Sequence, residues 1–116
     1  MSSESLELMK GTLDVLVLKT LSWGPMHGYG VSRWIRQRTG GTLEVEDAAL
    51  YQALHRMERR GWLASEWGRS ENNRRAKFYR LTDRGERQLR DQTREVRRYV
   101  DALLVVLDAR GAGAAP

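Results

Sequence analysis

The sequence of 116 residues contains no cysteine and only two histidines. Without cysteine there is no disulfide framework, no thiol nucleophile and no thiolate ligand for a metal ion. His27 and His55 lie far apart with no cluster of carboxylates between them, so we expect no metal site. No nucleophile and base are paired and no glycine-rich phosphate loop is present, which argues against an enzyme and predicts no cofactor.

Long hydrophobic runs are also missing. The longest, around Leu16 and Leu104, are far too short to cross a bilayer, and the first residues lack a signal-peptide pattern. We therefore expect a cytoplasmic protein. The length corresponds to one domain, and a hydrophobic content of 41% supports only a small core.

The net charge is +5, and the positive charge is concentrated in one part of the chain. Positions 69–98 hold eleven Lys and Arg residues against five Asp and Glu residues. A localised basic segment favours an anionic polymer as partner. For residues 84–98 a solvated helix surface is the better explanation. For the earlier cluster we favour nucleic acid, and this cluster consists of Arg69, Arg74, Arg75, Lys77 and Arg80.

The hydrophobic pattern predicts two helices in the first part of the chain, over residues 6–21 and 28–39. The first is apolar around most of its circumference between Leu13 and Leu21, which predicts that neighbouring elements enclose it. The second ends before Gly40 and Gly41, which suit a left-handed C-terminal cap. Residues 42–45 are expected to form a short edge strand.

A third helix is predicted over residues 47–60, capped by Glu46 or Asp47 and closed by Gly61. Its apolar residues fall within about 100° on a helical wheel, and they are Leu50, Ala53, Leu54 and Met57. Glutamine and arginine on the opposite face can make paired hydrogen bonds to base edges in the major groove. An ordinary polar helix surface is the alternative. The base-reading face that we predict consists of Ala48, Ala49, Gln52, His55, Arg56 and Arg59.

Residues 63–67 and 77–81 have the composition of strands, and residues 68–75 between them that of a polar turn. The apolar side of this hairpin is expected to consist of Trp67, Phe78, Tyr79 and Leu81. A helix, a glycine turn and a basic hairpin follow one another in the order of a winged helix. The tip of such a hairpin can reach phosphates or the minor groove. The wing contacts that we predict are Arg69, Asn72, Asn73, Arg74, Arg75, Lys77 and Arg80.

The last predicted helix covers residues 83–109, with Thr82 as its N-cap. Its apolar residues follow heptad spacing, which is typical of a helix that packs along another helix. So small a domain cannot cover Leu103, Leu104, Val106 and Leu107, although some of them can fold back on the first helix. We favour a homodimer, which also supplies two DNA-reading helices. The expected interface consists of Leu89, Val96, Val100, Leu103, Leu104 and Leu107.

The predicted fold is therefore mainly α-helical with a small β-hairpin wing: a winged helix-turn-helix followed by a long C-terminal dimerisation helix. The DNA-binding domain is expected over residues 6–81 and the dimerisation helix over residues 82–110. Residues 111–116 are small and are expected to be a disordered tail.

Four segments resemble the PadR family of bacterial winged-helix transcriptional regulators, in the short form with one C-terminal dimerisation helix. They are GTLDVLVLKTL (11–21), GPMHGYGVSRWI (24–35), ALYQALHRMERRGWL (49–63) and SENNRRAKFYRLTDRGERQL (70–89). The resemblance implies a homodimer that binds a palindromic operator in double-stranded DNA and usually represses. In some members a small hydrophobic effector lowers the affinity for DNA.

On this resemblance the recognition helix falls on residues 47–60 and the characteristic tyrosine on Tyr51, near the DNA backbone. His27 fits the family's HGY turn and is expected to cap or pack rather than to sense pH. The chain departs from the family at Ala48 and Ala49, where Gly-Ser or Gly-Thr is common, and at Gln52, where proline is common. The alternative function is a winged-helix protein-interaction module with sequence-blind DNA binding.

Overall fold

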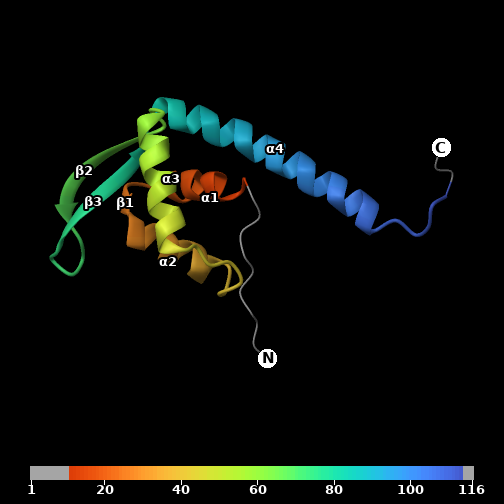
Figure 1. The fold of residues 1–116 in the computed structure, drawn as a ribbon, viewed down its shortest axis with the longest axis horizontal. Helices are drawn as coiled ribbons and strands as arrows, with labels where there is room; N and C mark the ends of the chain where they lie inside the picture. Colours follow the sequence, from red (N-terminus) through yellow and green to blue (C-terminus); the bar gives the residue numbers. More distant parts are fainter. Residues whose placement is uncertain (1–10, 114–116) are drawn as a thin grey trace.

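The computed structural model describes residues 11–113. The helices pack against one another, and a small three-stranded antiparallel sheet with the strand order β1-β3-β2 lies at one side of them (Figure 1). This architecture confirms the predicted fold class. In chain order the elements are α1 (Leu13–Leu21), β1 (Met26–His27), α2 (Gly28–Arg38), α3 (Asp47–Arg59), β2 (Leu63–Arg69), β3 (Arg75–Leu81) and α4 (Asp83–Leu107).

The first helix begins later than the sequence predicts. Residues 6–10 of the expected helix lie outside the described residues, and residues 11 and 12 are not helical. Gly11 has a φ of +88°, which a right-handed helix does not allow. The helix therefore starts after Thr12, whose carbonyl oxygen accepts the Leu16 amide at 3.2 Å. Its enclosure is confirmed, because Val15, Val17, Leu18, Thr20 and Leu21 are all buried.

The edge strand predicted at residues 42–45 is wrong, since only Leu43 of these four forms a bridge. The Thr39 hydroxyl accepts the Leu43 amide at 3.1 Å, so a local side-chain bond replaces a strand ladder. The third strand is instead β1, which pairs with β3 through Met26 opposite Tyr79 and His27 opposite Phe78.

The core lies where α3 meets the other elements. The predicted apolar face of α3 is confirmed, because Leu50, Ala53, Leu54 and Met57 are each at most 1% exposed. The residues packed with α3 come from α1, α2 and both long strands: Val17, Leu18, Leu21, Val31, Ile35, Leu63 and Tyr79.

The hairpin strands are longer than the sequence predicts. Their register runs from Leu63 opposite Leu81 to Arg69 opposite Arg75, so the strands take in Gly68 and Arg75, for which the composition predicts a turn. Only residues 70–74 turn. Asn73 adopts a φ of +58°, a left-handed conformation that asparagine tolerates.

The apolar side chains of the hairpin do not share one side, contrary to the expectation from the sequence. Because neighbouring strand residues point to opposite faces, Phe78 cannot face the same way as Tyr79. Tyr79 is 2% exposed in the core. Phe78 lies on the other face, against the His27 ring, with ring centroids 5.3 Å apart.

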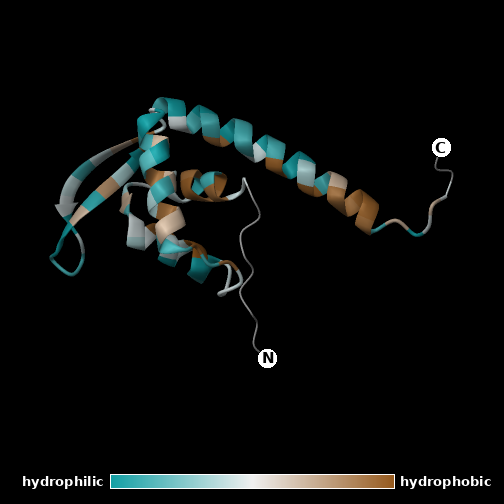
Figure 2. Ribbon diagram, in the orientation of Figure 1, coloured by the Kyte–Doolittle hydropathy of each residue, from teal (hydrophilic) through white to brown (hydrophobic). Residues whose placement is uncertain are grey.

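The fourth helix confirms its predicted start. The Thr82 hydroxyl caps it by accepting the Gly85 amide at 3.0 Å. The helix ends at Leu107, two residues before the predicted end. Its first turns pack on α1 and β3, whereas its apolar last turns extend away from the other elements (Figure 2).

The expected tail lies partly outside the described part of the chain. Residues 111–113 form no regular structure, and residues 114–116 are not described. Within residues 11–113, no helix is long and apolar enough to cross a membrane.

Gly85 is required where α4 passes the end of α3. An added Cβ would lie 2.1 Å from the Trp62 carbonyl oxygen. We therefore expect Gly85→Ala to lower the free energy of unfolding by about 2 kcal/mol or more. Chemical denaturation at fixed protein concentration measures this. Gly30→Ala is the control, since its nearest neighbour would lie at 3.4 Å, and a loss as large as for Gly85 would contradict the prediction.

Candidate nucleic-acid interface

The polar face of α3 points away from the core. Ala48, Gln52, His55 and Arg59 are exposed, while Ala49 is half-buried. Because the inner face of the helix is buried, its rotation is fixed and these side chains remain presented to solvent. Glu46 occupies the N-cap position without a side-chain hydrogen bond.

Arg56, which we predicted among the base-reading residues, has an intramolecular partner. Its guanidinium pairs with the carboxylate of Asp14 in the first turn of α1. The Arg56 side chain is 37% exposed and that of Asp14 only 20%. The pair ties α3 to α1, so Arg56 differs from Gln52 in having to break a contact before it can reach a base.

Tyr51 lies at the junction of α3 and α2. A Cβ at Gly28 would come within 2.8 Å of the Tyr51 ring and hydroxyl, so glycine allows α2 to begin directly against this ring. Tyr51 remains 43% exposed. It is thus placed where the start of α2 and the outer side of α3 meet.

Glu58 connects α3 to the hairpin. It accepts a hydrogen bond from the Ser65 hydroxyl at 2.6 Å and pairs with Lys77 at 3.5 Å. The Lys77 ammonium also lies 5.5 Å from the centre of the Tyr79 ring. Burial raises the pKa of Tyr79, so its hydroxyl stays protonated beside Lys77. These contacts hold the base of the wing against α3.

The other cations of the wing are distributed over both of its faces. Arg75 stacks on Trp67, with its guanidinium carbon 4.5 Å from the ring centroid. Arg69 donates to the Asn73 carbonyl oxygen at 3.2 Å and so supports the turn. Arg80 faces away from Lys77 and Arg75, because its position along β3 differs from each of theirs by an odd number. The structure therefore does not bring Arg80 together with the other predicted wing residues.

A groove of about 490 Å³ separates α3 from the wing. It is lined on one side by Tyr51 and His55, and on the other by residues 70–72 and 74–77. Among its lining residues, Arg74, Arg75 and Lys77 supply positive charge and Glu71 is the one carboxylate. Such a basic groove beside an exposed polar helix suits the sugar-phosphate backbone of a nucleic acid.

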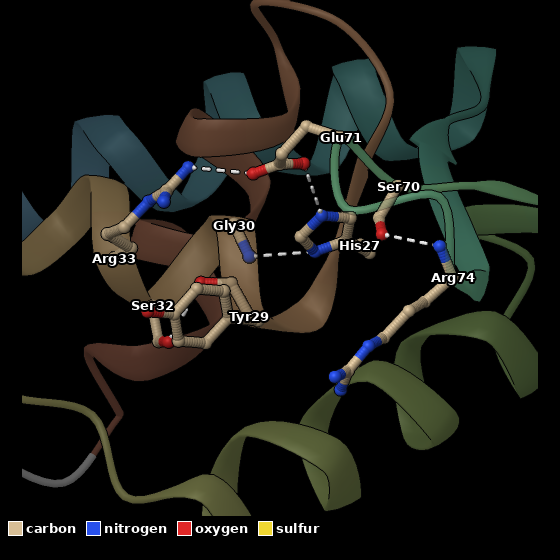
Figure 3. Close-up of polar contacts among 8 residues, drawn as sticks. All are labelled: His27, Tyr29, Gly30, Ser32, Arg33, Ser70, Glu71 and Arg74. Atoms are coloured by element: carbon tan, nitrogen blue, oxygen red, sulfur yellow. Dashed lines mark hydrogen bonds and ion pairs between the residues drawn. The ribbon is translucent and has the colours of Figure 1, made fainter.

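The wing tip is fastened to α2 by His27 and Glu71 (Figure 3). His27 caps α2, as expected, since its Nδ1 accepts the Gly30 amide at 3.0 Å. The ring proton therefore sits on Nε2, which donates to the Glu71 carboxylate at 3.4 Å. Arg33 donates to the other Glu71 oxygen at 3.2 Å. Hydrogen bonds from its own backbone amide and from His27 lower the pKa of Glu71, so its carboxylate is charged at neutral pH.

Sequence reasoning missed Asp14, Arg33 and Glu71 at this interface. Their partners lie 38 to 44 residues away along the chain, and no local periodicity reports such pairs. The HGY turn was the one signal in the sequence for the contact at the wing tip, and it indicated only that His27 caps or packs.

The helices, the wing and the exposed face of α3 define a winged-helix protein with an added C-terminal helix. Residues 17–91, more than half of the chain, match the model of the transcriptional regulator PadR-like family. The chain belongs to this family. It is accordingly a transcriptional regulator and not an enzyme.

Solved structures agree with this assignment. A transcriptional regulator from Clostridium thermocellum is 28% identical, with 81% of this chain and 88% of that chain covered and a TM-score of 0.74. A PadR family regulator from Eggerthella lenta DSM 2243 is 32% identical, covering 87% and 86%, with a TM-score of 0.73. Bacillus subtilis PadR in complex with operator DNA is 22% identical, covering 69% of this chain and 45% of that chain, with a TM-score of 0.62. This last likeness shows the fold alone.

The Asp14–Arg56 pair should contribute to stability. We expect a double-mutant cycle of Asp14→Ala and Arg56→Ala to give a coupling free energy of about 0.5–1 kcal/mol, the upper range for partly exposed pairs. Chemical denaturation of the four proteins measures it. Gln52→Ala should leave stability unchanged within about 0.5 kcal/mol, and additive effects of the two pair variants would show that the contact does not form in solution.

Proposed function

We propose that the protein is a homodimeric repressor that binds a palindromic operator in double-stranded DNA. The observation that carries the proposal is the exposed polar face of α3 beside a groove lined by wing cations. A helix of this kind enters the major groove while a wing holds the backbone. The fold shared with Bacillus subtilis PadR, which was solved with operator DNA, supports the same mode of binding.

Within this proposal, α3 reads bases and the wing contacts the backbone. The base-reading role falls first on Gln52, since its amide can pair with adenine and it is exposed. Arg59, His55, Ala48 and Ala49 complete that face, and Arg56 joins it only if DNA replaces Asp14. The proposed backbone contacts are Tyr51, Arg69, Asn72, Asn73, Arg74, Arg75 and Lys77. Arg80 lies on the other face of β3, and its proposed contact is from that side of the wing.

The C-terminal helix supports the proposed dimer. Its last turns expose a run of apolar side chains, from Leu103 at 37% to Val106 at 74%. Each large apolar side chain that becomes buried contributes about 1.5–3 kcal/mol. Leu89 already packs against the domain core, so the dimer interface proposed for α4 rests mainly on Val96, Val100, Leu103, Leu104 and Leu107.

The proposal divides the chain into a DNA-binding part at residues 6–81 and a dimerisation part at residues 82–110. Two-fold symmetry of the dimer presents two copies of α3, which is why the operator is palindromic. The proposal also includes a small hydrophobic effector that lowers the affinity for DNA and so relieves repression. Tyr99, 59% exposed on α4, offers such a molecule an aromatic surface. A cytoplasmic location also belongs to the proposal, because a regulator that binds a chromosomal operator acts there.

DNA binding is tested with duplexes from the region upstream of the protein's own gene. Gln52→Ala should change the preferred sequence, because it removes a base contact. Arg74→Ala with Arg75→Ala should weaken binding to all duplexes and lower the slope of log K against log salt by about one for each phosphate that is no longer neutralised. Mobility shifts and fluorescence anisotropy give both readouts.

The matched control is Arg97→Ala with Arg98→Ala, which removes the same charge from the exposed surface of α4. Equal effects of the two double variants would contradict the role of the wing. Failure of the wild-type dimer to retard any duplex at low salt would contradict DNA binding. Binding that is blind to sequence would favour a protein-interaction module instead.

The dimer interface is tested by Leu103→Glu. The substitution removes two buried leucines from each symmetric dimer, so the dissociation constant should rise at least about 100-fold. Analytical ultracentrifugation measures it, with circular dichroism as the check on folding. Val105→Glu is the control, since Val105 lies roughly opposite Leu103 on the helix and is 72% exposed. A dimer that Leu103→Glu leaves intact would exclude this interface.

A further inference from the structure

Glu71 has a charge that opposes the proposed function of the surface around it. It is the one acidic residue among positions 69–75, which also hold Arg69, Arg74 and Arg75. Its side chain is 55% exposed at the tip of the wing. A carboxylate at this place repels DNA phosphates, so it weakens binding unless it has another effect.

The contacts of Glu71 indicate a structural effect, which is to hold the wing tip against α2. One carboxylate oxygen accepts from His27 at 3.4 Å and the other from Arg33 at 3.2 Å, and both partners belong to the segment that starts α2 (Figure 3). His27 is itself fixed, because Nδ1 caps the helix and the ring packs on Phe78 of β3. Glu71 is thus bound to a rigid part of the domain.

The distal part of the wing has little other support. The third strand pairs only with Phe78 and Tyr79 of β3, so the hairpin from Lys77 to the tip is a two-stranded ribbon. Such ribbons are only marginally stable alone, and they twist readily. The contact from Glu71 to α2 restrains the ribbon at its far end.

Restraint of the wing tip also fixes the position of Arg74 relative to α3. In Figure 3 the Arg74 side chain runs from the tip toward α3, away from Glu71. Arg74 lines the groove together with Tyr51 and His55 of α3. A tip that swings away from α2 would change the distance between Arg74 and this helix.

We propose that Glu71 is a positioning residue for DNA binding, whose carboxylate ties the wing tip to His27 and Arg33 and thereby sets where Arg74 meets the DNA backbone. This inference rests on the proposed function. It predicts that an acidic residue near the phosphates strengthens binding, which is the opposite of what its charge alone predicts.

The test compares Glu71→Gln with Glu66→Gln in the full-length protein. Glu66 is exposed on the same hairpin and has no ion pair within residues 11–113. Both variants remove one negative charge, but only Glu71→Gln also weakens the contact with α2, because the amide keeps one oxygen acceptor where the carboxylate has two. With a duplex from the upstream region of the protein's own gene, Glu71→Gln should weaken binding about two- to five-fold and lower the salt slope by up to about one. Glu66→Gln should leave the affinity equal or slightly higher.

Tighter or unchanged binding by Glu71→Gln, with an unaltered salt slope, would overturn the inference. Arg33→Gln gives a second measure, because its effect and that of Glu71→Gln should not add if they break the same contact.

A measurement of wing-tip motion in the DNA-free protein tests this inference independently of the proposed function. In Glu71→Gln the backbone order parameters of Asn72 and Asn73 should fall from about 0.85 toward 0.6 or below, as measured by nitrogen-15 relaxation. If the wild type binds no duplex, the proposed function fails while this loss of order still supports the restraint. Order parameters that do not change would overturn the restraint whatever DNA binding shows.

Discussion

Burial of four side chains on α3 fixes the rotation of that helix about its own axis. Leu50, Ala53, Leu54 and Met57 are at most 1% exposed, and they contact α1, α2 and the long strands. A shift of one residue would turn the helix by about 100° and expose side chains whose burial contributes up to about 3 kcal/mol each. The outward direction of Gln52 is therefore a consequence of core packing and not of its own contacts.

One junction links α3, the proposed recognition helix, to α4, the proposed dimerisation helix. The Thr82 hydroxyl donates to the Gly61 carbonyl oxygen at 2.6 Å and accepts the Gly85 amide at 3.0 Å. The Thr82 amide donates to the Trp62 carbonyl oxygen at 3.0 Å. Because the end of α3 and the start of α4 share these few residues, packing of α4 in the proposed dimer would set the distance between two copies of α3. Under the proposed function, that distance has to match half-sites about one helical turn apart.

The parts of the fold that were predictable from the sequence are those with a local signal. Helical period and closing glycine defined α3, and Thr82 marked the start of α4. Local signals failed where a competing or distant contact determines the structure. The Leu43 amide donates to the Thr39 hydroxyl instead of to a strand ladder, and the partner of Arg56 lies 42 residues away. For the site, the sequence therefore predicted the presented surface of α3 and the basic wing, but not the carboxylates that hold them.

Those carboxylates also reduce the contribution that the cations of the interface should make to DNA affinity. Lys77 pairs with Glu58, Arg33 with Glu71 and Arg56 with Asp14. A cation that leaves a carboxylate for a phosphate exchanges one anionic partner for another. The freed carboxylate then attracts a cation from solution, so the net release of counterions is smaller than the number of protein cations suggests. Arg74, which has no ion pair within residues 11–113, carries no such cost. Affinity should therefore depend on a few unpaired cations at the wing tip, and their position relative to α3 matters more than the total charge.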